Sequence, residues 1–438
     1  MADVTASAEV RLWGDLVGGV LELNDGQIVF EYAEAFRTSG LEISPLKLPL
    51  RLRRPVQFAE LREKEAFRGL PGVLADALPD AFGKTVMRAY YTSRGELERA
   101  FSPVQHLLYV GERALGAFTF HPAEELPVRA AETEALEVAR LVADARRIIQ
   151  GGVDVAIPEI FRIGSSAGGM RPKAVVLYNA TSGEVRSAFA NPLPDDVPAI
   201  LKFDGVGDIT AASGLGTPQP FNRIEAAYTD MARDAGLDVV DFAVLESAEG
   251  HAHLLVHRFD RIAEDSGFRA LHQHTLGGLL HVDYNDPGAS SYEEYLRTML
   301  SLDLPPASID EGYRRMVFNV LAINQDDHVK NLSFHMDPTG TWSLTPAYDL
   351  TFSKGRGFTR AHQMRVRDKR EGITHSDLLT VAREFGVRAP DRVVARVRDA
   401  VARWPEFAAR HRVPNDDVRR VQAELNARAE LMRRPNDG

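Results

Sequence analysis

The period of the hydrophobic pattern changes near residue 262, and this change constrains the fold more than any other feature of the sequence. Before it, short segments alternate apolar and polar residues, as half-buried strands do. After it, apolar residues recur at helical spacing, so that Tyr313, Met316 and Val320 fall on one stripe of a helix. The pattern predicts an α+β protein with a β-rich first part, a mostly α-helical second part and a cleft between them.

The first part also contains turn and helix signals. A hairpin turn is expected at residues 24–26, between two alternating segments. One helix is expected over residues 131–150, and another over 222–236, which Asn222 can cap and Gly236 can end. The segments that read as short strands are 173–178, 199–203 and 253–259.

One hairpin is expected to interrupt the helices of the second part. In the predicted pairing, Leu332 and Phe334 face Trp342 and Leu344 across a type I turn sequence at residues 337–340. Apart from this hairpin, strand signals nearly vanish in the second part. The hairpin therefore stands out as a local feature within a helical lobe.

Composition is that of a globular protein and excludes several chemistries. Hydrophobic residues make up 44% and charged residues 26% of the 438 residues, enough for two domains or one large two-lobed unit. The net charge of -10 argues against bulk affinity for nucleic acids. The lack of cysteine excludes disulfides, thiolate catalysis and cysteine zinc sites. We find no signal-peptide pattern and no apolar run of bilayer length, so we expect a cytoplasmic protein.

Polar residues crowd into residues 323–334, between an apolar helix and an apolar strand. Asp326 follows the helix, and Asn331 begins the hairpin. After the hairpin, a second short loop contains Asp349. Because both loops flank the same end of one hairpin, we expect the two carboxylates and the amide to meet at one edge of the cleft.

Phosphoryl transfer from ATP needs this set of side chains. One carboxylate accepts the proton of the attacking hydroxyl, while another carboxylate and an amide oxygen bind Mg²⁺. Protein kinases separate the base and the amide by five positions, as Asp326 and Asn331 are separated here. Lys330 lies between them, where it can neutralise the transferring phosphoryl group. Two other interpretations stay open, namely a polar loop after a helix and a metallohydrolase that uses Asp326, Asp327 and His328.

A strand lysine and a Gly-rich loop add to the kinase interpretation. Lys202 lies in an otherwise apolar strand, where it needs a partner, and Glu225 of the next helix can supply one. Alternatively, Lys202 is an edge-strand lysine and Glu225 an exposed helix residue. Residues 162–176 can cradle phosphates with their backbone N–H groups, although most Gly-rich segments are only turns. The order of these parts and Asp349 along the chain is the kinase order.

At these segments the chain strongly resembles the HipA family, the serine/threonine-kinase toxins of bacterial toxin–antitoxin pairs. The resemblance implies a two-lobed protein-kinase-like, HipA-like fold. Its parts would be an N-terminal β-rich subdomain over residues 1–125, the rest of the N-lobe over 126–261 and a helical C-lobe over 262–438. The matching segments are "VRLWGDLVGGVLEL", "GVLADALPDAFG", "SSAGGMRPKA", "AILKFDG", "HRFDR", "HQHTLGGLLHVDY", "NQDDHVKNLSF" and "PAYDLTFS".

The resemblance implies roles for the matched positions. Asp326 matches the catalytic base, and Asn331 and Asp349 match the magnesium ligands. Lys202 matches the ATP-binding lysine, and Glu225 lies where its helix partner is expected. These assignments agree with those made above from spacing.

Other matched positions border the expected nucleotide. The backbone at His257 and Phe259 is implied to meet adenine, although the family commonly has Glu where this chain has His257. Gln273 is implied to lie near the ATP site. Phe259 and Tyr348 can line the nucleotide pocket, but aromatic residues more often fill the core.

The resemblance implies an ATP- and Mg²⁺-dependent serine/threonine protein kinase that acts as a toxin and phosphorylates itself. Ser165 matches the autophosphorylated serine, and Ser166 is the neighbouring candidate. The implied substrate is an aminoacyl-tRNA synthetase of the glutamyl type. The implied partner is a HipB-like helix-turn-helix antitoxin, and operator DNA would be bound only by the pair. The phosphate loop would comprise Ser165, Ser166, Ala167, Gly168 and Gly169.

Two other functions stay open, a kinase of a small molecule or lipid and a non-catalytic co-repressor that binds DNA with an antitoxin. Three histidines, His272, His274 and His281, lie close together in the sequence, but nothing else supplies metal ligands there. We therefore favour packing and hydrogen-bonding roles for them. Residues 376–434 look helical throughout and are rich in arginine. A solvated face is the ordinary interpretation of these helices, and contact with an antitoxin or DNA is the alternative.

Overall fold

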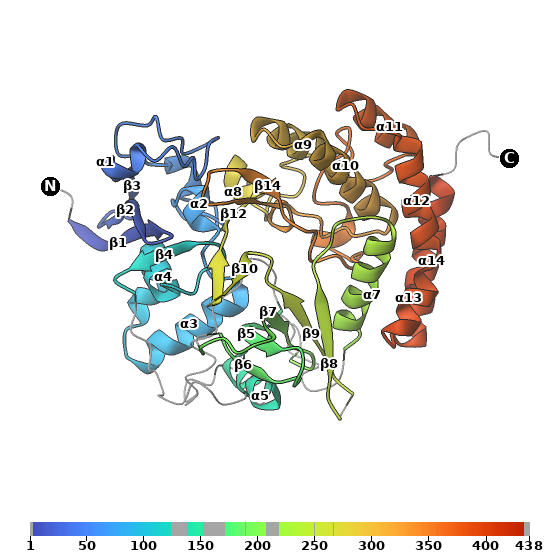
Figure 1. Ribbon diagram of the computed structural model, residues 1–438, viewed down its shortest axis with the longest axis horizontal. Helices are drawn as coiled ribbons and strands as arrows, with labels where there is room; N and C mark the ends of the chain where they lie inside the picture. Colours follow the sequence, from blue (N-terminus) through green and yellow to red (C-terminus); the bar gives the residue numbers. More distant parts are fainter. Residues whose placement is uncertain are drawn as a thin grey trace.

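The computed structural model has three adjacent parts, an N-terminal sheet, a five-stranded sheet and a helical lobe (Figure 1). It describes residues 3–432 apart from 124–135, 137, 150, 152–170, 189, 207–218, 249 and 266. In Figure 1 the C-terminal helices lie at the opposite side of the molecule from the N-terminal sheet. The expected α+β layout, with strands first and helices later, is therefore present.

The N-terminal sheet has four antiparallel strands in the order β3-β2-β1-β4. The hairpin predicted at residues 24–26 joins β2 to β3, and Gly26 has the positive φ that suits glycine, +75°. The strands are β1 (Val4–Leu12), β2 (Asp15–Leu23), β3 (Ile28–Tyr32) and β4 (Phe118–His121). The accompanying helices are α1 (Glu34–Arg37), η1 (Ala59–Leu61), α2 (Gly72–Ala75), α3 (Ala81–Ser93), η2 (Leu97–Phe101) and α4 (Pro103–Val110).

The second sheet has five antiparallel strands in the order β6-β5-β7-β9-β8. All three strand segments predicted in this region are confirmed. Helix α5 (Val138–Ile149) lies within the helix predicted over residues 131–150, and α7 (Phe221–Asp234) lies between β7 and β8 in the chain. The strands are β5 (Lys173–Asn179), β6 (Val185–Ser187), β7 (Asp196–Lys202), β8 (Phe242–Glu246) and β9 (Ala252–His257).

The prediction that Asn222 caps α7 is wrong. The helix begins one residue earlier, with Pro220 as its N-cap, and Asn222 is buried in the first turn. Its Nδ2 atom donates to Lys202 O at 3.1 Å and to Ala252 O at 2.9 Å. The side chain thus joins α7 to two strands of the sheet, a long-range role that local capping rules do not predict. Gly236 follows the end of the helix with a φ of +89°, as predicted.

The second part of the chain is mainly helical, and the helices predicted over residues 376–434 are present as far as residue 431, with interruptions at 385–389 and 411–414. Buried aromatic residues such as Tyr292, Tyr313 and Trp404 belong to the apolar cluster that joins these helices. No helix in the described ranges is long and apolar enough to span a bilayer. The helices are α8 (Leu276–Leu280), α9 (Tyr292–Ser301), α10 (Pro306–Leu321), η3 (Val329–Asn331), η4 (Phe358–Arg360), α11 (His375–Glu384), α12 (Pro390–Ala402), α13 (Trp404–Arg410) and α14 (Asn415–Leu431).

The expectation of a single hairpin beyond residue 262 is wrong, because three further strands form. Strands β10 (Arg261–Glu264) and β11 (Gly267–Ala270) pair with each other, and β12 (His272–Thr275) adds to the predicted hairpin. Each has only four residues, too few to show a period, and β12 is polar throughout. Tertiary pairing rather than local pattern therefore forms these strands.

The predicted hairpin forms with a different register. It consists of β13 (Ser333–Met336) and β14 (Trp342–Leu344). Leu332 precedes the first strand, and its carbonyl accepts from Leu276 N at 2.7 Å. The turn is present, since Gly340 N donates to Asp337 O at 2.9 Å. The apolar pairs that form are Phe334–Leu344 and Met336–Trp342.

The N-terminal part docks tightly onto β12 and α8. A Cβ atom added to Gly72 of α2 would lie 2.1 Å from the carbonyl oxygen of Gly278 in α8, so only glycine permits this approach. Gly72 N donates to His281 Nε2 at 3.0 Å, and His272 Nε2 bonds to Ile43 O at 2.9 Å. The hydrogen-bonding roles favoured for these histidines are thus confirmed.

Candidate active site

The two loops predicted to flank the hairpin lie side by side. Gln325 N donates to Ser353 O, and Ser353 N donates to Ile323 O, both at 3.0 Å. Asp326 directly follows this bridge in one loop, and Asp349 precedes it in the other. The two carboxylates are therefore carried by adjacent segments at one edge of the helical lobe.

Asn331 closes the first loop onto Asp326. Its Nδ2 atom donates to Asp326 O at 3.0 Å, at the end of the short helix η3. This bond fixes the direction of the amide, so the Oδ1 atom is the one that can bind a cation. The five-residue spacing recognised in the sequence therefore corresponds to one compact turn.

Lys202 joins the two lobes electrostatically. Its Nζ atom lies 2.5 Å from Glu225 Oε1 and also forms an ion pair with Asp349 Oδ1. The predicted pairing of Lys202 with Glu225 is thus confirmed, and the edge-strand alternative is wrong because Lys202 is buried. Asp349 has a φ of +54°, a strained conformation for a residue with a side chain, of the kind found at functional sites.

The Lys202 cluster, defined as Lys202, Glu225 and Asp349, holds more negative than positive charge. Burial opposes the charge of Lys202, but Asp349 and Glu225 raise its pKa to about 12. Burial raises the pKa of Glu225. For Asp349, burial is outweighed by Lys202 and then by Lys173, which lower its pKa. The two carboxylates carry one more charge than the single ammonium neutralises, so a bound cation would balance the charge of the cluster.

Asp326 has the environment expected of a proton acceptor. Burial raises its pKa, and the nearby charges of Asp349 and Asp327 raise it further, whereas His328 lowers it. His328 Nε2 lies 4.0 Å from Asp326 Oδ1, and 41% of the Asp326 side chain remains exposed. An incoming hydroxyl group can therefore reach this carboxylate, whose raised pKa favours uptake of a proton.

Asp327, the next residue, has a structural role. The sequence alone did not distinguish this role from the role predicted for Asp326. It is 2% exposed, and its oxygens accept from Tyr292 Oη at 2.8 Å and from Gln363 N at 2.7 Å. Since these oxygens are occupied, Asp327 is a poor metal ligand. No group of three acidic or histidine ligands occurs in the parts of the chain that the structure describes. The metallohydrolase interpretation therefore loses its basis.

Lys330 does not join the Lys202 cluster. Its ammonium lies 5.0 Å from the ring centroid of Tyr284. Burial lowers its pKa, and the carboxylates of Asp76, Asp80 and Asp283 partly reverse that shift. The acids that act electrostatically on Lys330 thus come from outside the Asp326 loop. Its predicted action on the transferring phosphoryl group stays a prediction.

Aromatic residues predicted to border the nucleotide lie together. The rings of Phe259 and Tyr348 are 5.3 Å apart with an interplanar angle of 30°. The hydroxyl of Tyr348 donates to Lys330 O at 2.7 Å. His257 ends β9 and donates its backbone N–H to Asp241 O at 2.9 Å. That N–H is therefore not available for the predicted adenine contact.

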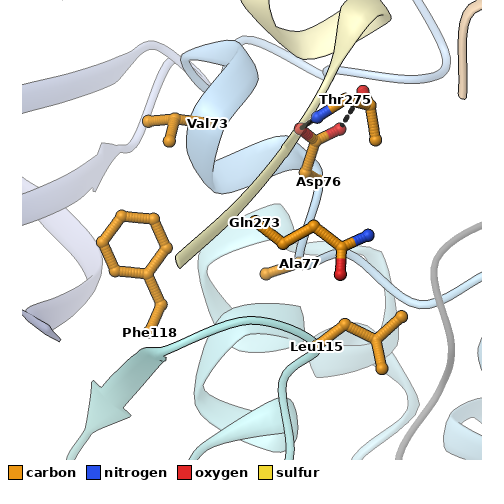
Figure 2. Close-up of a pocket in the computed structure, with 7 residues that line it drawn as sticks. All are labelled: Val73, Asp76, Ala77, Leu115, Phe118, Gln273 and Thr275. Carbon is orange, nitrogen blue, oxygen red and sulfur yellow. Dashed lines mark hydrogen bonds between the residues drawn. The ribbon is translucent and has the colours of Figure 1, made fainter. Parts of the chain in front are cut away.

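Gln273 lies in β12, opposite His335 of β13, whose ring is 5.2 Å from that of Phe259. Figure 2 shows its side chain at a small cavity between the N-terminal part and β12. The cavity measures about 10 Å³, room for about one water molecule. Gln273 is thus close to the aromatic pair, but this cavity is too small to hold a nucleotide. It is lined by Val73, Asp76, Ala77, Leu115, Phe118, Gln273 and Thr275.

The predicted phosphate loop falls outside the described residues. Ser165, Ser166, Ala167, Gly168 and Gly169 belong to this stretch. Arg171 and Lys173 follow it directly and are described. Sequence reasoning did not single out Lys173, although a lysine at the start of the apolar segment 174–177 was a usable signal.

Two family models match the chain. The HipA N-terminal domain matches residues 8–121, and the HipA-like C-terminal domain matches residues 165–405. The second match alone spans more than half of the chain. Together they include the N-terminal sheet, the strand of Lys202 and both loops with Asp326 and Asp349.

Individual proteins show the same similarity. The chain is 25% identical to a Sinorhizobium fredii protein named "Putative kinase Y4dM" over 356 residues, which are 78% of this chain and 76% of that protein. It superposes on HipA of Shewanella oneidensis MR-1, solved with HipB and operator DNA, with a TM-score of 0.66, 19% identity and 97% coverage of both chains. The proinflammatory kinase CtkA of Helicobacter pylori has a TM-score of 0.38 and 12% identity over 61% of this chain and 90% of that chain. The Shewanella match confirms the predicted fold class.

Proposed function

Because the chain belongs to the HipA family, we propose that it is a toxin-type serine/threonine protein kinase that transfers the γ-phosphoryl group of ATP to a protein hydroxyl. The observation that carries the proposal is the Lys202 cluster. A lysine from β7, a glutamate from α7 and the Asp349 carboxylate meet beside the Asp326 loop. Protein kinases use this combination to hold ATP and its metal.

The residues present fit a magnesium ion. Asp349 offers a carboxylate and Asn331 an amide oxygen, both hard ligands of the kind that Mg²⁺ prefers. The excess negative charge of the Lys202 cluster would be balanced by a divalent cation. A magnesium ion held there by Asp349 and Asn331 would supply positive charge to offset the negative charge of the phosphates.

The chain's own residues would supply orientation and proton transfer. Lys202 contacts the nucleotide phosphates, and Glu225 keeps its ammonium aimed at them. Asp326 accepts the proton of the attacking hydroxyl, as its raised pKa and partial exposure favour. The paired aromatic rings of Phe259 and Tyr348 form one wall of the nucleotide pocket.

The biological setting is also proposed from the family. We propose a HipB-like antitoxin as partner, with operator DNA bound only by the pair, since the Shewanella HipA was solved with HipB and operator DNA. An aminoacyl-tRNA synthetase of the glutamyl type is the proposed substrate. Autophosphorylation is proposed at Ser165, with Ser166 as the neighbouring candidate.

Incubation of the purified protein with γ-labelled ATP and magnesium tests the proposal. With the wild-type protein we expect label on the protein itself or, when a cell lysate is added, on proteins of the lysate. With Asp326→Ala we expect no label in either reaction. Absence of label with both proteins would favour the co-repressor alternative. Label found only on small molecules or lipids would favour the alternative kinase class. A melting curve for the variant checks that it remains folded, since loop residues seldom carry core stability.

A further inference from the structure

The turn between α2 and α3 is fastened at both of its ends. Asp76 accepts from the backbone N–H and the hydroxyl of Thr275, at 2.8 and 2.7 Å (Figure 2). It also bonds to His274 Nδ1 at 2.6 Å. Asp80 Oδ1 accepts from Gly83 N at 2.7 Å and caps α3. The turn thus has a fixed position between β12 and the start of α3.

The second carboxylate oxygen of Asp80 reaches the five-stranded sheet. Asp80 Oδ2 lies 3.1 Å from Nζ of Lys173, and the two side chains are 3% and 6% exposed. Burial raises the pKa of Asp80, and the charge of Lys173 opposes that shift. The N-terminal part and the nucleotide-binding lobe are therefore joined by a buried ion pair.

Lys173 lies next to the Lys202 cluster. In the antiparallel pairing of β5 with β7, Lys173 is directly opposite Lys202, which places their Cβ atoms roughly 5 Å apart. Lys202 in turn forms an ion pair with Oδ1 of Asp349. A second buried ammonium therefore borders the carboxylate that we expect to bind magnesium.

We propose that Asp80 is a positioning residue of the active site, which aims the ammonium of Lys173 at the nucleotide phosphates beside Lys202. The N-terminal part of the chain thereby completes the nucleotide site formed by the two kinase lobes. The inference rests on the proposed function, because it requires a nucleotide at the Lys202 cluster.

Two physical arguments support a positioning role. Lysine ends in a compact charge on a flexible stem, and like charges directly opposite each other in a sheet repel. The carboxylate of Asp80 offsets this repulsion and holds the ammonium of Lys173 at one place in the interior. The hydrogen bond from Gly83 N to the other oxygen of Asp80 restricts rotation of this carboxylate. Preorganised charges of this kind bind phosphates without the cost of ordering flexible side chains.

Titration of the full-length protein with Mg-ATP tests this role. Asp80→Asn keeps an oxygen for Gly83 N and removes the charge, so we expect ATP to bind about tenfold more weakly, the order seen when an orienting partner of a binding side chain is lost. Asp80→Ser, which also caps helices well, should behave in the same way if the first variant does not fold. The matched control is Asp196→Asn, because Asp196 forms an equally buried pair with Arg186 in the same sheet. It should lower the melting temperature without changing ATP affinity.

The same titration in a Lys173→Met background distinguishes a positioning role of Asp80 from a general loss of structural stability. If Asp80 acts through Lys173, Asp80→Asn should weaken ATP binding no further in this background. Equal losses in both backgrounds, or unchanged affinity in Asp80→Asn, would overturn the inference. A wild-type protein that binds ATP but transfers no phosphate would overturn only the proposed function. A wild-type protein that binds no ATP would overturn both.

Discussion

Asp327 and the Lys202 cluster both contain buried acids close to the Asp326 loop, and they are built differently. Asp327 is sealed from solvent, and its oxygens meet the hydroxyl of Tyr292, a ring nitrogen of His362 and a backbone N–H. In the Lys202 cluster two carboxylates share one ammonium, and 28% of the Asp349 side chain stays exposed. The hydrogen-bonding capacity of Asp327 is satisfied within the protein, whereas the Lys202 cluster keeps an unbalanced charge and exposed surface for a ligand.

The difference distinguishes a carboxylate whose oxygens are satisfied within the fold from one that can still bind a ligand. Hydrogen bonds that satisfy every oxygen of a carboxylate stabilise the fold but leave nothing to bind a substrate. Unbalanced charge and partial exposure are destabilising by themselves and persist at functional sites. Asp326 and Asp327 are adjacent in the sequence, yet the side chain of Asp326 is 41% exposed whereas Asp327 is buried with both oxygens hydrogen-bonded.

The largest effect should come from Asp326→Asn. Loss of the proton acceptor should lower phosphoryl transfer about a thousandfold, within the range for general bases. The melting temperature should stay close to that of the wild type, because the side chain is partly exposed. Measurement of transfer rates with saturating ATP checks this. If the variant kept more than about a tenth of the wild-type transfer rate, Asp326 would not be the proton acceptor.

Lys202→Met should destabilise the fold by about 3 kcal/mol at pH 7, because it leaves two buried carboxylates without their cation. In the wild type, Lys202 lowers the pKa of Asp349, so this stabilisation is complete above the unfolded value of about 3.9. This stabilisation is lost only as the pH falls through the pKa of Asp349 in the folded protein, which is lower than its unfolded value. In the variant both acids should protonate more readily. The destabilisation should therefore shrink as the pH falls towards 5.

Denaturant titrations of wild type and Lys202→Met at pH 7 and pH 5 measure this change. Arg186 supplies the control, since Arg186→Met breaks a buried pair with Asp196 away from the Lys202 cluster. It should destabilise the protein but leave ATP affinity unchanged. A pH-independent effect of Lys202→Met would contradict the charge imbalance described here.

Asp327→Asn should show the opposite profile to Asp326→Asn. It replaces an acceptor by an amide group whose N–H₂ faces other donors, which should cost about 2 kcal/mol of stability. Calorimetric melting measures this loss, and titration of the folded variant should give wild-type ATP affinity. Loss of nucleotide binding in a folded Asp327→Asn protein would mean that Asp327 belongs with the functional acids.

The smallest effect concerns how the charge of Asp326 affects the stability of the fold. Because the pKa of Asp326 is raised in the folded protein, its charged form disfavours folding above that pKa and has no such effect below the unfolded value of about 3.9. Asp326→Asn should therefore melt slightly higher than the wild type at pH 7 and at the same temperature near pH 3. A lower melting temperature at pH 7 would contradict the raised pKa.

Much of this arrangement follows from local sequence patterns. The strand of Lys202, the helix of Glu225 and the spacing of Asp326 and Asn331 were predictable because periodicity and turn chemistry act over a few residues. The pairing of Lys202 with Glu225 was predictable because a buried ammonium requires a partner.

Other features depend on contacts between distant segments. Asn222 bonds to two strands instead of capping its helix, and β12 forms only against β13. The Asp80–Lys173 pair joins segments that no local pattern relates. The loop that contains Ser165 and Ser166 stays a prediction.

The sequence by itself determined most of the strands and helices, although not β10, β11 and β12, and it determined which polar residues share one loop. These features depend on local hydrophobic period and hydrogen bonding. Only the tertiary structure decided which acids form ion pairs with the same lysine and which are buried with their oxygens hydrogen-bonded. Burial and charge proximity arise between residues such as Lys202 and Asp349, 147 positions apart, and the same aspartate gains or loses a ligand-binding role according to the partners that folding brings to it.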